Sequence, residues 1–205
     1  MSFLDTIREQ RLIAIVRGSD PDAALAAVVT IVEAGISLVE VSLTTADATG
    51  VLERARDRLG PGAPLGAGTV LTDADAARAA DAGASFVVTP GLGPGVAAAQ
   101  ARGLAVVAGA LTPSEVIAAS ALGVDAVKLF PAAIGGARYL RALRDPFPTV
   151  PFVPVGGVDA QAAVDYLAAG AVAVGVGSPL LGDAASGGSL DELRQRCAEF
   201  RRAVG

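Results

Sequence analysis

Short apolar runs alternate with alanine-rich stretches along the whole chain, and this alternation limits the folds that are possible. Eight such runs occur in the 205 residues, and their first residues are 19 to 28 positions apart. Each interval has room for one strand, one helix and two short turns. The alternation therefore predicts parallel strands joined by right-handed crossovers. The runs begin near Leu12, Ile36, Pro64, Ser85, Leu104, Asp125, Pro151 and Ala171.

Several of the stretches between the runs carry the signals that begin and end helices. A polar capping residue or a first-turn proline stands at one end, and glycine follows the other end. The predicted helices run from Asp20 to Gly35, from Asp73 to Gly83, from Thr112 to Gly123 and from Asp159 to Gly170, with a leading helix over Ser2 to Gln10 and a final one over roughly Ser189 to Val204.

Eight strand-helix units predict an α/β fold, a closed (β/α)8 TIM barrel with an N-terminal helix. We expect a single domain over residues 1–205, because no linker divides the chain. The alternative is an open doubly wound sheet, which the count of eight and the lack of a dinucleotide fingerprint after the first run disfavour. The stretch Gly182 to Ser189 is predicted to be a loop.

Missing residue types exclude several kinds of catalytic site. The chain has no His, one Cys (Cys197) and a single Lys, Lys128, beside fifteen Arg. A Ser-His-Asp or Cys-His nucleophile is impossible, as is a zinc site built from His or Cys. We expect no metal and no other cofactor. Only Lys128 can supply a side-chain amine nucleophile, although a coding bias toward Arg would by itself explain the Lys count.

Charge and hydropathy indicate a soluble protein whose partners are small molecules. The formal net charge is −5, which argues against a nucleic-acid partner. No apolar run reaches the roughly 18 residues that span a membrane. The N-terminus lacks the basic and apolar segments of a signal peptide. We therefore expect a cytoplasmic protein that binds neither nucleic acid nor a membrane.

Lys128 is a candidate nucleophile, because chemistry in TIM barrels takes place at the carboxyl ends of the strands. It lies in the apolar run from Asp125 to Phe130. A lysine in a parallel strand is costly unless it is used or paired. Burial favours the neutral amine, which can attack a carbonyl and form a Schiff base. The alternative is a structural lysine whose stem packs at the strand end while its head reaches solvent.

Glu40 is a carboxylate inside the apolar run from Ile36 to Leu43. Near an iminium, such a group can act as a general base with a raised pKa. A structural ion pair with Lys128 or Arg17 would explain it equally well. Arg17, Thr69 and Thr89 are further polar residues at predicted strand ends.

Two glycine-rich turns indicate an anion site. Gly156-Gly157 follows the seventh run and Gly177-Ser178 follows the eighth. Unobstructed backbone amides near helix N-termini bind anions, and the loops after strands 7 and 8 are the usual phosphate site of such barrels. Tight turns also need glycine, so each pair alone is a weak signal.

Six motifs, in order over the full length, carry a family resemblance. They are EVSL from Glu40, GAGTVL from Gly66, VTPG from Val88, TPSE from Thr112, KLFPA from Lys128 with Gly135-Gly136, and PVGG from Pro154. The chain resembles the class I 2-keto-3-deoxy-6-phosphogluconate (KDPG) and 4-hydroxy-2-oxoglutarate (KHG) aldolases. The second and fifth motifs are the most specific.

The resemblance implies a homotrimer that reversibly cleaves KDPG, and also KHG, to pyruvate and an aldehyde such as glyceraldehyde 3-phosphate. It implies that Lys128 is the Schiff-base lysine and that Glu40 is the general acid and base. The substrate-binding residues that it implies are Thr69, Pro90, Phe130, Gly156, Gly157 and Ser178. The predicted substrate-binding set also contains Arg17, Val155 and Gly177, which come from the strand ends and the glycine-rich turns.

Two positions depart from the pattern of the phosphogluconate enzymes. Their motif E-V-T-L-R-T contains an Arg that grips the substrate carboxylate, and this chain has Thr44 there; Arg17 could supply the cation instead. Their motif P-T-G-G has Thr where this chain has Val155. The branch that acts on the C4 epimer, 2-keto-3-deoxy-6-phosphogalactonate, resembles this chain at both positions, so the galactonate is an alternative substrate.

Two functions outside the aldolases are alternatives. A phosphosugar isomerase or epimerase would use the anion turns and employ Glu40 as a carbon base. A binding or assembly module whose catalytic residues have drifted is the other, and the intact Lys128, Glu40 and Thr69 argue against it.

Overall fold

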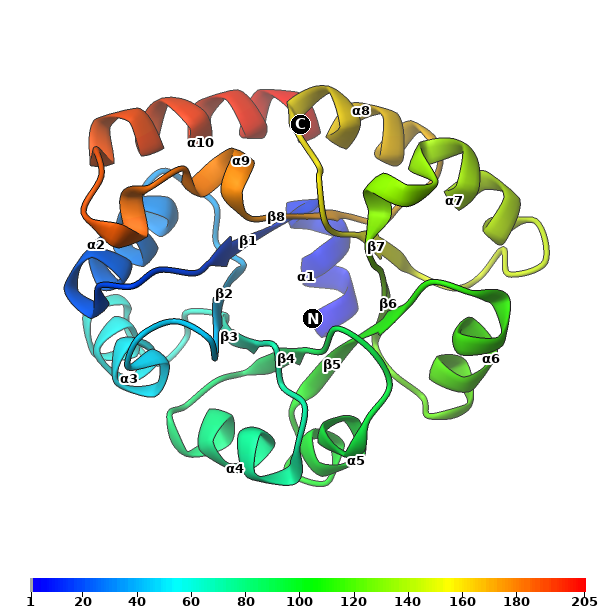
Figure 1. Cartoon of the computed structure of the whole chain (residues 1–205), viewed down its shortest axis with the longest axis horizontal. Coiled ribbons are helices and arrows are strands. Elements are labelled where there is room, and N and C mark those ends of the chain that lie inside the picture. Colours follow the sequence, from blue (N-terminus) through cyan, green and yellow to red (C-terminus); the bar gives the residue numbers. More distant parts are fainter. Residues whose placement is uncertain (1) are drawn as a thin grey trace.

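The computed structural model describes residues 2–205, and its eight strands form one parallel sheet in the order β7-β6-β5-β4-β3-β2-β1-β8. The edges β7 and β8 meet through a bridge between Val155 and Gly175 and a 3.0 Å bond from the Val172 amide to the Phe152 carbonyl. The predicted TIM barrel is confirmed (Figure 1). The strands are β1 (Leu12–Val16), β2 (Val39–Ser42), β3 (Leu65–Gly68), β4 (Phe86–Val88), β5 (Ala105–Ala110), β6 (Ala126–Leu129), β7 (Phe152–Pro154) and β8 (Val174–Val176).

The four helices predicted from their end signals are present, and so are the predicted leading and final helices. Ser2, Thr72 and Thr112 each form a capping box with the first turn that follows. No described helix is long and apolar enough to cross a membrane. The helices are α1 (Phe3–Gln10), α2 (Pro21–Glu33), α3 (Ala48–Leu59), α4 (Asp73–Asp81), α5 (Pro94–Gln100), α6 (Pro113–Ala121), α7 (Gly136–Arg144), α8 (Ala160–Ala168), α9 (Ser178–Leu181) and α10 (Leu190–Val204).

The segment after β8 differs from the prediction. The stretch Gly182 to Ser189 contains a 3-10 turn at Ala184–Ser186, and the short helix α9 precedes it. The turn is held because the Ser19 amide and hydroxyl contact the Ser186 hydroxyl, each at 3.2 Å. Contacts between residues so far apart in the sequence leave no local signal.

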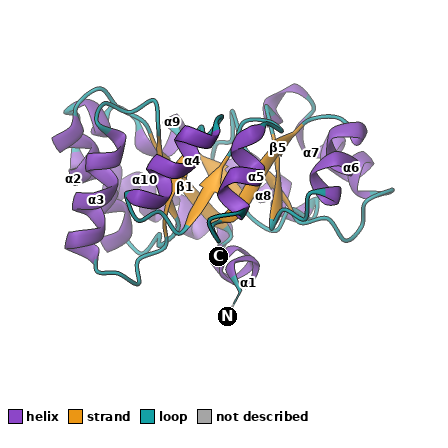
Figure 2. Cartoon of the chain, turned by 90° about the horizontal axis from the view of Figure 1, so that it is seen from below, coloured by secondary structure: helices purple, strands orange, loops and turns teal. Residues whose placement is uncertain are grey.

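Helix α1 closes the end of the barrel at which the strands begin. Figure 2 shows it at one end of the molecule, outside the ring of the other helices. The side chain of Ile7 is fully buried in the inward-facing cluster that contains Ile13, Leu38 and Phe86. The Phe3 ring lies 4.9 Å from the Phe86 ring, centroid to centroid. The lower half of the barrel interior is therefore an apolar core.

Arginines of neighbouring helices cover several helix C-termini. The Arg144 guanidinium of α7 donates to the Ala169 carbonyl at 3.3 Å, and that of Arg201 in α10 donates to the Ala34 carbonyl at 3.1 Å. A cation at this place is favoured by the helix dipole and satisfies carbonyls that lack a helical partner. Arg196 of α10 does the same for the Leu180 carbonyl at 2.7 Å.

Replacing Ile7 by Ala tests the role of α1. Because the side chain is fully buried at the barrel floor, its loss leaves a cavity, and we expect unfolding free energy to fall by about 2–4 kcal/mol. Glu9→Ala is the control, since Glu9 is exposed on the same helix. Urea denaturation measures both variants. Equal stabilities would show that α1 contributes little to the barrel.

Candidate active site

A cavity of about 540 Å³ opens at the carboxyl ends of the strands. The residues assigned to catalysis or substrate binding all line it, although their roles stay predictions. Thr89, the other strand-end candidate, does not line it: this residue is buried, and its hydroxyl donates to the Gly91 carbonyl at 2.8 Å. The strand β5 contributes no lining residue. The Pro90 backbone lies directly against Gly109 of β5, so close that a Cβ on Gly109 would collide with it. The eleven predicted residues are Arg17, Glu40, Thr69, Pro90, Lys128, Phe130, Val155, Gly156, Gly157, Gly177 and Ser178.

Lys128 is buried on the inward face of β6, with 7% of its surface exposed. Gly109 of β5 and Val153 of β7 are its neighbours in the sheet, so one flank carries no side chain. Its Nζ lies 4.9 Å above the centre of the Phe130 ring. Burial lowers the pKa of Lys128, the Glu40 carboxylate partly opposes this, and Arg17 adds to the lowering. The site thus favours the neutral amine.

Glu40 is buried on the inward face of β2, with 2% of its surface exposed. The room for its carboxylate comes from Gly68, because a Cβ there would overlap the Glu40 Oε1 atom. Burial raises the pKa of Glu40, and the charges of Lys128 and Arg17 partly counter the rise. The site thus favours the protonated acid.

Glu40 and Lys128 face the same cavity without forming an ion pair. Within residues 2–205, no ion pair joins Glu40 to Lys128 or to Arg17. The structural ion pair that would explain Glu40 is therefore not formed. The two groups have their pKa values moved toward one another, which is typical of a nucleophile beside an acid or base.

Thr69 stands at the cavity wall in a strained backbone conformation. Its φ angle is +62°, a region that a β-branched residue adopts rarely. Its hydroxyl lies 2.9 Å from that of Ser42 at the end of β2. Strain of this kind, which is worth about 1–3 kcal/mol, is concentrated at functional sites.

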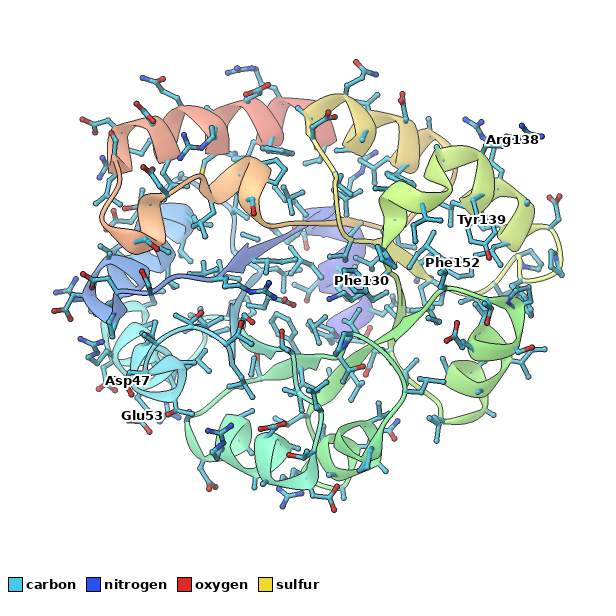
Figure 3. The ribbon with its side chains drawn as sticks, in the orientation of Figure 1. Asp47, Glu53, Phe130, Arg138, Tyr139 and Phe152 are labelled. Carbon is cyan, nitrogen blue, oxygen red and sulfur yellow. The ribbon has the colours of Figure 1, made fainter. Side chains whose placement is uncertain are left out.

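The loops after β6 and β7 are joined and form one wall. The Ala132 amide donates to the Val155 carbonyl at 2.9 Å, and the Tyr166 hydroxyl donates to the Ala132 carbonyl at 2.8 Å. Figure 3 shows Phe130 reaching inside the ring of strands, while Phe152 lies on the other side of the sheet. Phe130 is therefore held over the cavity by its own loop.

The two glycine turns both line the cavity, and α8 and α9 begin just after them. Gly156 and Gly157 have φ angles of +100° and +72°, which only glycine adopts freely. Among residues 2–205, no backbone carbonyl accepts from the Gly157 or Ser178 amides. These amides are available to an anion.

Further residues line the cavity that were not predicted. Ile15 and Gly175 stand two positions before Arg17 and Gly177, so strand alternation could have found them. Pro179 and Leu181 of α9 were missed because that helix was not predicted, whereas its first residue, Ser178, was predicted from the glycine-rich turn. Thr44 is exposed and outside the cavity. The remaining lining residues are Val158, Pro179, Leu181 and Gly182.

Comparison with known proteins decides the family. Residues 4–195 match the aldolase family described as KDPG and KHG aldolase. The chain belongs to the KDPG and KHG aldolase family. The resemblance drawn from the six motifs is confirmed.

Relatives in this aldolase family cover nearly all of the chain. The probable 2-dehydro-3-deoxy-6-phosphogalactonate aldolase of Rhizobium meliloti is 36% identical over 92% of this chain and 88% of its own. The KHG/KDPG aldolase of Escherichia coli K12 is 36% identical over 82% of this chain and 80% of its own. The KDPG aldolase of Legionella pneumophila, solved with pyruvate captured as a covalent carbinolamine intermediate, has a TM-score of 0.86 and 27% identity, covering 100% and 98% of the two chains.

Replacing Glu40 by Gln tests the burial of this carboxyl in the aldolase. The native pKa is raised, so between the unfolded and native pKa values the native state binds more protons, and stability falls as pH rises. We expect Glu40→Gln to raise the melting temperature at pH 8, with about 1.4 kcal/mol for each unit of raised pKa. The gain should vanish below about pH 4.3, where the carboxyl is protonated in both states.

Asp73→Asn is the control, because Asp73 is an exposed carboxylate at the start of α4. Melting temperatures followed by circular dichroism across this pH range measure the difference. A gain from Glu40→Gln that is equal at pH 4 and pH 8 would contradict the raised pKa.

Proposed function

We propose that this chain is a metal-independent Schiff-base aldolase that reversibly cleaves a 2-keto-3-deoxy-6-phospho sugar acid to pyruvate and glyceraldehyde 3-phosphate. One observation carries the proposal. A buried amine and a buried carboxyl, Lys128 and Glu40, face the same cavity with their pKa values shifted toward their neutral forms and with no ion pair between them. Family membership supports the reaction class.

The first stage forms the iminium. The neutral Lys128 amine attacks the C2 ketone of the substrate and gives a carbinolamine. Protonated Glu40 gives its proton to the carbinolamine hydroxyl, which leaves as water, and the C2–N bond becomes an iminium. The raised pKa of Glu40 keeps the proton available for this step.

The second stage breaks the carbon-carbon bond. The Glu40 carboxylate, now unprotonated, removes the proton of the C4 hydroxyl. The C3–C4 electron pair moves into the iminium to form an enamine, and the C4 oxygen becomes the carbonyl of the departing aldehyde. Glu40 then returns the proton to C3. Water adds to the new iminium, and as pyruvate leaves, the proton that is released passes to the Glu40 carboxylate, which restores the neutral Lys128 amine and the protonated acid.

The remaining cavity residues would orient the substrate. We assign the Thr69 hydroxyl and the Arg17 guanidinium to the carboxylate of the pyruvate portion, since both reach this cavity. Phe130 and Pro90 would pack beside that portion. The substrate phosphate would lie against the turns that contain Gly156, Gly157, Gly177 and Ser178.

Trapping with borohydride and pyruvate tests the nucleophile. Because Lys128 is the only lysine, we expect one stable adduct, which peptide mass spectrometry places on Lys128. Lys128→Arg should lose at least about 1000-fold in kcat, since a guanidinium stays protonated.

A double variant, Lys128→Arg with Arg138→Lys, moves the single lysine to the exposed surface of α7 and is the matched control (Figure 3). It should form no adduct under the same conditions. Two results would favour the isomerase or epimerase over the aldolase. One is substantial turnover by the Lys128→Arg variant, and the other is full activity of the wild-type protein without any adduct on Lys128.

The galactonate epimer is the second candidate substrate, and Val155 favours it. This side chain is 6% exposed and borders the cavity, where it offers no hydroxyl to the substrate. Thr44 is exposed and supplies no cation there. A site that hydrogen-bonds one hydroxyl configuration rejects the other when that bond is lost.

Pyruvate release from the two C4 epimers and from KHG, measured side by side, identifies the substrate. We expect Val155→Thr to shift the ratio of the kcat/KM values toward the gluconate epimer by about tenfold, because the new hydroxyl can bond near C4. Val158→Thr also adds a hydroxyl at the cavity and is the control. An unchanged ratio in Val155→Thr would remove this residue from the determination of C4 specificity.

We also propose that the chain assembles as a homotrimer. Several large apolar side chains are exposed on one copy, and an assembly that covers any of them would remove apolar surface from water. They are Leu71, Ile117, Leu122, Ile134 and Val164, with 41–72% of their surfaces exposed.

A further inference from the structure

Three hydroxyls form a chain from the surface to the cavity at the ends of β2 and β3. The hydroxyl oxygens of Thr44 and Ser42 are 2.8 Å apart, and those of Ser42 and Thr69 are 2.9 Å apart. Ser42 is fully buried, Thr44 is exposed, and Thr69 lines the cavity. The middle member thus connects a solvent-facing hydroxyl to one that faces the cavity.

The hydrogen-bonding capacity of Ser42 restricts how the chain can be ordered. A serine hydroxyl has one proton to donate and can accept twice. The Thr44 amide already donates to the Ser42 oxygen at 3.4 Å. One further bond is accepted and one is donated, so the two threonine hydroxyls have opposite roles.

Only two orders satisfy this restriction. In the first order, Thr44 donates to Ser42, Ser42 donates to Thr69, and the Thr69 proton is free to point into the cavity. In the second order, Thr69 donates to Ser42 and presents only lone pairs to the cavity. A carboxylate has only acceptors, so it selects the first order.

We infer that Ser42 is a positioning residue that turns the Thr69 hydroxyl into a donor to the carboxylate of the bound keto acid. This inference rests on the proposed function. Ser42 acts through Thr69 and does not itself line the cavity. A donor whose oxygen accepts a bond from a neighbouring hydroxyl is a stronger donor, because hydrogen bonds in a chain polarise one another.

The setting of Thr69 explains why it needs this help. Its backbone is held at a φ of +62°, and the Leu43 amide donates to the Gly68 carbonyl at 2.8 Å, which ties the end of β2 to the residue before Thr69. The backbone thus holds Thr69 beside Ser42, where their hydroxyl oxygens are 2.9 Å apart, but it does not set which of the two hydroxyls donates. Ser42 is the protein hydroxyl with which Thr69 forms a bond among residues 2–205.

Trapping on Lys128 with two ketones tests the inference. Pyruvate carries the carboxylate and acetone does not, so only pyruvate uses the Thr69 donor. We expect Ser42→Ala to raise the pyruvate concentration for half-maximal borohydride trapping by about tenfold, with the rate of acetone trapping within about twofold of wild type. Thr44→Val, which removes only the outer hydroxyl, should raise it by about threefold.

Ser85→Ala is the matched control, because the Ser85 hydroxyl bonds the Leu65 carbonyl at the opposite end of the neighbouring strands. It should leave both ketones unaffected. In steady-state assays, Ser42→Ala should raise KM for the sugar acid more than it lowers kcat.

The outcomes separate the inference from the proposed function. Wild-type trapping of pyruvate with an unchanged half-maximal concentration in Ser42→Ala would overturn the role of Ser42 and leave the aldolase intact. Equal loss of pyruvate and acetone trapping in Ser42→Ala would show a structural role only. If wild type traps neither ketone on Lys128, the Schiff-base proposal fails, and the inference fails with it.

Discussion

The desolvation of two ionisable groups inside one barrel is the constraint on which the rest of the site depends. Lys128 and Glu40 lie on inward faces of β6 and β2, where burial acts against either charge. The same physical cause, burial, lowers the pKa of Lys128 and raises the pKa of Glu40, so a single environment shifts both groups toward their neutral forms. Burying these two groups costs free energy of folding, and the apolar side chains that α1 and the lower barrel interior bury compensate for that cost.

Two glycines of β3, which carry no side chain, leave space for side chains of the strands on either side. A Cβ on Gly66 would overlap the Phe86 ring, and a Cβ on Gly68 would overlap the Glu40 carboxylate. The two glycines stand on one face of β3, so one strand leaves room for the apolar floor and, one layer above, for the acid. The glycines of the GAGTVL motif are therefore needed because they leave space for neighbouring side chains. Thr69 of the same motif directly follows Gly68, the glycine that leaves space for the Glu40 carboxylate.

The barrel and most site residues could be predicted from the sequence because their signals are local. Strand runs, capping residues and glycines at helix ends all lie within a few positions of what they specify. The helices α3, α5 and α7 were expected only from the alternation, and in the structure Asp47, Gly93 and Gly135 at their starts make no side-chain cap. The bond between Ser42 and Thr69 spans 27 positions and depends on the register that pairs Ser42 with Gly68, which no local pattern encodes.

The different positions of arginine and lysine in this chain follow from the same effect of burial on charge. Arg144 and Arg201 bond carbonyls at helix ends, and a permanent positive charge is what that task requires. At position 128 a permanent charge would be buried on an inward strand face, and a guanidinium there could neither lose its proton nor attack a carbonyl. A coding bias can replace lysine by arginine wherever charge alone is sufficient, and in the proposed Schiff-base mechanism position 128 is the one at which the side chain must lose its proton.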